Sequence, residues 1–251
     1  MILRRVTQHV KDQNWFAVFL DFLIVVFGVY IGLQVQDWAV EKKRLSTERQ
    51  YLERLHDEVE QLSTTREMYD ETRENMSQNM LEAIQILDNT DLEAALSDEQ
   101  CRNIAHSSFT TIPPAELPSA TELISSGRLD QIASSSLRDS ILSYIQDAAR
   151  VRDLITTLSE SSVDLSRIYP ELIQTKVNHQ DYWRDTITLQ ATCSASELRT
   201  NQAFINDFNA NVYMYVIYTD RGVLAVSQKL AELHNELDMT LDINHTAKEN
   251  N

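Results

Sequence analysis

The amino-acid sequence predicts an all-α protein, in which an N-terminal transmembrane helix continues into a long helix that packs in an elongated antiparallel helical bundle. Three observations support this fold class. Residues 15–35 form an almost uninterrupted apolar run. The 251-residue chain contains only 4 Gly and 4 Pro, so few positions break helices. Apolar residues recur three and four positions apart through most of the remaining chain, which is the period of an amphipathic helix.

The apolar run at residues 15–35 is predicted to cross a membrane. As a helix it would span roughly 30 Å, the thickness of a bilayer's hydrocarbon core. Trp15 and Trp38 lie near its two ends, where aromatic rings favour the level of the lipid headgroups. One alternative is a buried core helix, which seldom runs this long without polar residues. The other is a cleaved signal peptide, for which residues 34–38 offer no small-x-small cleavage site.

One face of this helix is predicted to contact another membrane helix. At 100° per residue a single stripe holds Ala17, Asp21, Ile24, Gly28 and Gly32. The small-xxx-small spacing of the two glycines permits close approach of two backbones, although this spacing also occurs by chance. Asp21 is either shallow enough to reach water, protonated, or paired with a polar group on a neighbouring helix. The expected partners are the lipid bilayer and, through this helix, a second copy or another membrane protein.

The charge distribution favours one orientation in the membrane. A basic tail, residues 1–14, precedes the apolar run, and most of the acidic residues follow it in a chain of formal net charge −16. We expect a signal-anchor with the N-terminus in the cytoplasm and the bulk of the chain in the periplasm, although Lys42, Lys43 and Arg44 on the far side weaken the positive-inside argument. The acidic surface makes nucleic acid a poor partner.

Residues 36–88 are predicted to form one long juxtamembrane helix with a coiled-coil-like seam. The seam is clearest from Leu52 to Leu62, and two arginines, Arg66 and Arg73, interrupt it. The seam can pack against a second copy or against later helices of the same chain. We favour packing within the chain, because later segments also have apolar faces that can pair with the seam. The first seam positions are Trp38, Leu45, Leu52, Val59, Arg66, Arg73, Met80 and Leu87, and the fourth positions are Leu55, Leu62, Tyr69, Met76 and Ala83.

Residues 89–135 are predicted to form a cap of short helices around a Pro-rich loop at residues 109–118. Ser97 and Gln100 have the spacing of a capping box. Ser119 has the position of an N-cap for a helix that Gly127 ends.

Residues 136–243 are predicted to hold the remaining bundle helices. One helix begins after the serines at 134–136 and extends toward Tyr169, and another covers about residues 197–242, with a bend at Gly222. Residues 170–197 between them form either a strand or an irregular packed loop. Residues 244–251 are expected to fray.

Cys101 and Cys193 both lie in connecting segments. Two cysteines in a periplasmic domain would form a single disulfide, whereas in the cytosol they would be ordinary thiols. We predict the disulfide as part of the periplasmic topology.

No catalytic, cofactor or metal motif is found in the sequence. The 6 His form no HExxH or His-x-His pattern and no pair of Glu-x-x-His motifs, and His56 belongs to an acidic run that we expect to be solvated rather than ligating. Glycines are too few for a phosphate-binding loop. The aromatic residues Tyr213, Tyr215, Tyr218 and Trp183 form either helix-packing core or a surface for a protein partner or small ligand.

Two stretches resemble an uncharacterised family of short single-pass bacterial inner-membrane proteins. The first is FLDFLIVVFGVYIGLQVQDW at residues 19–38, which leads into RQYLERL at 49–55; the second is ELISSGRL at 122–129, followed by Ser136, Arg138 and Tyr144. The resemblance implies bacterial origin and membrane anchoring, and it transfers no functional residues.

These observations predict a non-enzymatic, membrane-anchored helical protein that serves as a scaffold or accessory subunit through protein–protein contacts. The alternative is a periplasmic ligand-sensing or binding module.

Overall fold

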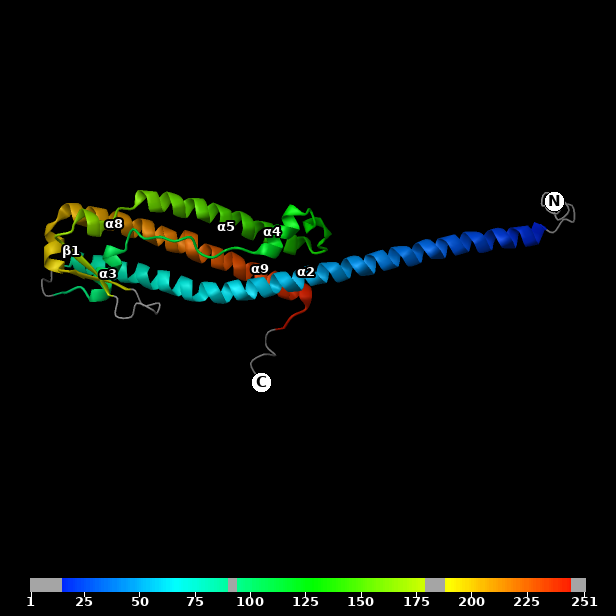
Figure 1. Cartoon of the computed structure of the whole chain (residues 1–251), viewed down its shortest axis with the longest axis horizontal. Helices are drawn as coiled ribbons and strands as arrows, with labels where there is room; N and C mark the ends of the chain where they lie inside the picture. The colour runs from blue at the N-terminus through cyan, green and yellow to red at the C-terminus, as the bar shows by residue number, and fades with distance from the viewer. Residues whose placement is uncertain (1–14, 90–93, 179–187, 245–251) are drawn as a thin grey trace, which may run out of the picture. The chain divides into compact units, whose positions relative to one another are not determined.

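The computed structural model describes residues 15–89, 94–178 and 188–244 (Figure 1). The chain forms two units, Met1–Tyr51 and Leu52–Asn251, and each is described by itself. Helix α2 (Trp15–Asp88) contributes to both units. The second unit also contains α3 (Asp98–Ala105), α4 (Pro118–Ser125), η1 (Leu129–Gln131), α5 (Ser135–Ser161), α6 (Leu165–Ile168), β1 (Ile173–Asn178), β2 (Thr188–Cys193), α7 (Ala195–Thr200), α8 (Gln202–Ile217), η2 (Tyr218–Leu224) and α9 (Ala225–Leu241).

The second unit is an antiparallel helical bundle, which confirms the predicted fold class. Residues at increasing positions along α2 contact residues at decreasing positions along α8, η2 and α9. The pairs are His56 with Asp238, Arg66 with Ser227, Tyr69 with Tyr218 and Met76 with Tyr215.

The seam of α2 packs within its own chain in the second unit. Its buried positions are Leu52, Leu55, Val59, Leu62, Arg66, Met80, Ala83 and Leu87. The apolar stripes of α5, α8 and α9 provide the rest of the core, with Tyr144, Phe204, Phe208 and Leu233 among its fully buried side chains. Trp38 and Leu45, the seam positions that fall in the first unit, are exposed.

An extended segment, residues 109–117, lies in the bundle beside the helices (Figure 1). It includes Pro113 and Pro114, which lack a backbone N–H and disfavour helix in the residues before them. The Pro-rich loop is therefore confirmed as non-helical. Its backbone groups need partners from other elements, because an extended strand outside a sheet has none of its own.

The C-terminal helix is not continuous from 197 to 242, as the sequence predicted. It consists of α7, α8, the π-helical segment η2 and α9. Asn201 interrupts it first, because its side chain accepts a hydrogen bond from the Phe204 N–H and so starts α8 anew. Gly222 lies inside η2. A Cβ on Gly222 would be 3.5 Å from the side chain of Ile155 on α5, so η2 and α5 are in close contact at this point.

Helix α5 ends at Ser161 rather than extending toward Tyr169. The side chain of Asn211 on α8 both accepts from the Val163 N–H (3.0 Å) and donates to the Val163 carbonyl (2.8 Å). A side chain that pairs both backbone groups of one residue replaces the hydrogen bonds that a helix would supply.

A small antiparallel sheet occupies part of residues 170–197, for which the sequence predicts either a strand or an irregular loop. Strands β1 and β2 pair with Ile173 opposite Cys193 and Asn178 opposite Thr188. Trp183, a predicted partner-surface residue, and the tails 1–14 and 245–251 lie outside the described residues.

Helix α4 begins two residues earlier than predicted, and a side chain of another helix caps its N-terminus. Leu117 is the N-cap residue and makes no side-chain cap. The carboxylate of Glu58 on α2 instead accepts from the Ser119 N–H (2.9 Å) and the Ser119 hydroxyl (2.6 Å). At the other end Gly127 adopts φ 68°, and Arg128 N–H bonds to Leu123 O at 3.0 Å, the helix ending that the sequence predicted.

Glu58→Ala is expected to lower the free energy of unfolding by about 1–2 kcal/mol, because it leaves the Ser119 N–H at a helix N-terminus without its acceptor. Denaturant unfolding of the detergent-solubilised protein, followed by circular dichroism, measures the change. Glu67→Ala, at an exposed position of the same helix, is the matched control. Equal effects of the two substitutions would contradict a capping role for Glu58.

Candidate functional site

The N-terminal part of α2 is long and apolar enough to cross a membrane. The most apolar stretch of this helix is not buried against the rest of the chain. On the predicted contact face Asp21 and Ile24 are exposed, and a Cβ placed on Gly28 or Gly32 would meet no heavy atom within 4 Å. The side chain of Ala17 lies outside the described part of the structure. The face is therefore open to a neighbouring helix, and its contact stays a prediction.

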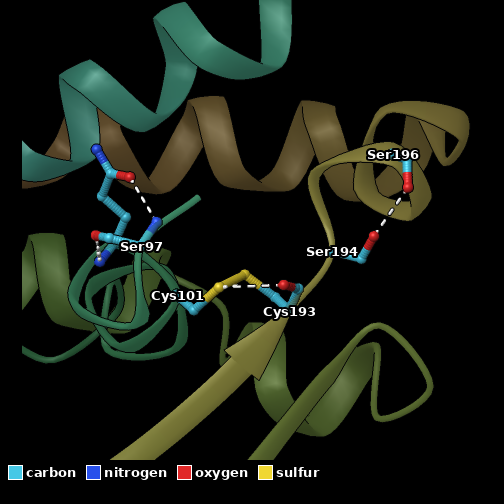
Figure 2. Close-up of a disulfide and its surroundings, with 6 residues drawn as sticks. Ser97, Cys101, Cys193, Ser194 and Ser196 are labelled. Carbon is cyan, nitrogen blue, oxygen red and sulfur yellow. Dashed lines mark hydrogen bonds between the residues drawn. A yellow bond between two sulfur atoms is a disulfide. The ribbon is translucent and has the colours of Figure 1, made fainter. Parts of the chain in front are cut away.

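The structure joins Cys101 and Cys193 in a disulfide, as the sequence predicted (Figure 2). The two Cα atoms are 5.6 Å apart, and the bond links α3 to the end of β2. Figure 2 also shows Ser97 at the start of α3, where its hydroxyl accepts from the Gln100 N–H while the Gln100 side chain accepts from the Ser97 N–H. The predicted capping box is thus confirmed, and it sets the first turn of the helix that carries Cys101.

Side chains from other elements satisfy the carbonyl groups of the extended segment. Tyr69 and Tyr218 donate to the Thr111 carbonyl at 2.6 and 3.0 Å. Tyr144 on α5 donates to the Ala115 carbonyl at 2.8 Å. Burial raises the pKa of Tyr69 and of Tyr144 to about 12, so these phenols keep their donor protons at neutral pH.

Arg66 is the centre of this polar network and is only 1% exposed. Its guanidinium donates to the Pro114 carbonyl (2.6 Å), to the Val223 carbonyl in η2 (2.6 Å) and to the Ser227 hydroxyl (2.7 Å). Asp70 lies 3.4 Å from the guanidinium and also accepts from Ser227. Burial lowers the pKa of Arg66 and raises that of Asp70, and the two opposite charges partly offset both shifts.

Of the two alternatives for the tyrosine cluster, Tyr215 and Tyr218 fit the helix-packing core rather than a partner surface. Tyr215 and Tyr218 are 1% and 0% exposed, because Tyr215 packs its hydroxyl 3.2 Å from the Met76 sulfur and Tyr218 faces Tyr69. Tyr213 is 69% exposed and alone of these three is accessible to a partner.

His56 is buried, contrary to the expectation that it would be solvated. It is 5% exposed and faces α9, where its Nε2 lies 2.8 Å from Asp238 Oδ1 and 3.2 Å from His234 Nε2. Ligand atoms of His56, Glu60 and His234 all lie within 4.8 Å of one another. The sequence did contain a signal for this cluster, since His56 with Glu60 and His234 with Asp238 are i,i+4 pairs that each occupy one helix face.

A polar groove lies elsewhere in the second unit. Among its lining residues are Arg73, Arg102, Asn103, His106 and Tyr215. Burial lowers the pKa of His106, and the positive charge of the nearby Arg102 lowers it further. The neutral form of the ring is therefore favoured more than in an exposed histidine.

Comparisons with family models, with curated proteins and with solved structures found no match. The resemblance to single-pass inner-membrane proteins therefore stays a prediction.

Proposed function

We propose that the protein is a non-enzymatic, single-pass membrane protein whose helical bundle acts as a scaffold or accessory subunit through protein–protein contacts. The observation that supports this most is the exposed apolar part of α2, which offers a long uncovered surface with two glycines on one face. Such a surface is stable in lipid, where small residues let helices pack closely.

The proposed location is the bacterial inner membrane, with the N-terminus in the cytoplasm and the bundle in the periplasm. The Cys101–Cys193 disulfide supports this orientation, because disulfides persist in the oxidising periplasm and are rare in the cytosol. The basic residues before the apolar run and the family resemblance agree with it.

The buried polar groups support a structural rather than a catalytic role for the bundle interior. Backbone carbonyls accept hydrogen bonds from Arg66, Tyr69, Tyr144 and Tyr218. Groups that are committed in this way hold the extended segment in place.

Substitution of both glycines, Gly28→Leu with Gly32→Leu, is expected to weaken association through the membrane helix by an order of magnitude, about 1.4 kcal/mol. Two γ-branched side chains would keep the backbones apart. Cross-linking in native membranes, followed by mild-detergent purification through a C-terminal tag and native mass measurement, gives the readout.

Val26→Leu with Tyr30→Leu changes the opposite face of the same helix and is the matched control. Recovery of a stoichiometric membrane assembly, or of a homo-oligomer, that is lost only in the glycine variant supports the proposal. Unchanged cross-linking and co-purification in the glycine variant would contradict the contact face.

A second candidate function is ligand sensing or binding in the periplasm. The groove lined by Arg73 and Arg102 favours it, because guanidinium groups that share a recess suit an anionic ligand, which would compete with Glu99 for Arg102. A purely monomeric protein with a saturable thermal shift from a small anion, lost in Arg102→Ala, would favour this function over the scaffold.

A further inference from the structure

Two helices each present a histidine and a carboxylate at the same place in the bundle. His56 and Glu60 lie one turn apart on α2, and His234 and Asp238 lie one turn apart on α9. Both pairs belong to the second unit, and their side chains meet across the antiparallel contact of the two helices.

The distances within this group are short enough for one ion to contact its side chains. His56 Nε2 lies 3.2 Å from His234 Nε2, and Asp238 Oδ1 lies 2.8 Å from the first nitrogen and 3.6 Å from the second. Around a tetrahedral zinc ion with bonds of about 2.0–2.1 Å, neighbouring ligand atoms are separated by roughly 3.3 Å. A single ion can therefore reach all three atoms with little movement.

We propose that His56, His234 and Asp238, with Glu60 as the fourth ligand, form a binding site for a divalent transition-metal ion of the zinc class. Imidazole nitrogens and carboxylate oxygens are the donors that zinc takes in proteins. Glu60 has a ligand atom within 4.8 Å of those of both histidines. The bound ion would join α2 to α9, and this inference is independent of the proposed scaffold role.

The site is reachable from solvent. A shallow groove leads to it, lined by Asp57, Glu60, Gln61, Ser63, Thr64 and His234. An ion can therefore enter and leave the folded protein, which makes the site titratable without unfolding.

The test uses the full-length protein in mild detergent, carrying a tag without histidines and stripped of metal by a chelator. Titration with Zn²⁺ is expected to show one ion per chain. Co²⁺ is expected to give the visible absorption of a tetrahedral site. At free zinc about 100 times the dissociation constant, the Tm is expected to rise by roughly 5–10 °C.

His234→Ala is expected to weaken zinc binding at least about 100-fold and to abolish the cobalt spectrum, because it removes a direct ligand. Glu60→Gln keeps the shape of the side chain and removes its charge, so it should weaken binding without loss of fold. His106→Ala, a histidine far from the cluster in the sequence, is the matched control and should bind as the wild type does.

Circular dichroism of each variant separates loss of metal from loss of fold, and His234 is the preferred position because its side chain is 24% exposed. Absence of equimolar zinc binding in the wild type would overturn the proposal. So would binding that is unsaturable, or that is equal in His234→Ala and the wild type, since the acidic surface would then account for it.

Discussion

Arg66→Met is expected to destabilise the second unit by about 3–5 kcal/mol, because it breaks a buried ion pair by removing one partner. The Asp70 carboxylate would lose its cation at a partly buried position, and the carbonyls of Pro114 and Val223 would lose their donor. The extended segment and η2 would both loosen. Denaturant unfolding, followed by circular dichroism, measures the loss.

The pH dependence of this variant has a definite sign. Arg66 lowers the pKa of Asp70, whereas burial, the larger influence, raises it above 3.8. Without Arg66 the pKa of Asp70 in the folded state rises further. The folded variant then favours the protonated, neutral carboxyl over the carboxylate. The variant should therefore recover stability at acid pH and lose it as pH rises through the folded-state pKa of Asp70.

Arg150→Met is the matched control, because Arg150 forms only an exposed i,i+3 pair with Asp147 and the same substitution there should cost at most about 1 kcal/mol. Arg66→Met combined with Asp70→Leu should recover part of the loss, since it removes the stranded carboxylate. If Arg66→Met and Arg150→Met are equally stable, Arg66 does not hold the network together.

Replacing both cysteines by serine is expected to lower the free energy of unfolding by about 2–5 kcal/mol. The disulfide closes a sequence separation of 92 residues, and a cross-link over so long a loop removes much of the freedom of the unfolded chain. It also ties the end of β2 to α3, a helix of only eight residues.

Unfolding with and without reductant measures this effect. Reductant should bring the wild type down to the midpoint of the double serine variant, and it should leave that variant unchanged. Labelling of both thiols in the unreduced native protein would refute the bridge and remove one support of the periplasmic orientation.

Signals that lie within one or two helical turns were predictable from the sequence. The apolar run of α2, the seam from Leu52 to Leu62, the capping box at Ser97 and the C-terminal glycine Gly127 all belong to this class. Each depends on residues that are neighbours in the sequence, so periodicity and capping rules are sufficient to find it.

Features that depend on helix packing were not predictable in the same way. The cap of α4 comes from Glu58, which is 61 residues from Ser119, and the π-helical segment η2 holds Gly222 where it approaches Ile155 on α5. The burial of Tyr215 and Tyr218 likewise depends on which face of η2 and α8 meets α2.

The sequence by itself therefore determined the helical class, the apolar helix suited to a membrane and the seam, and it made the disulfide conditional on a periplasmic location. Only the tertiary structure decided that Arg66 lies in the core and that His56 meets His234 across 178 residues of chain. The physical reason is the register between packed helices. A seam specifies which face of a helix is buried, whereas the polar partners depend on how far one helix is shifted along another.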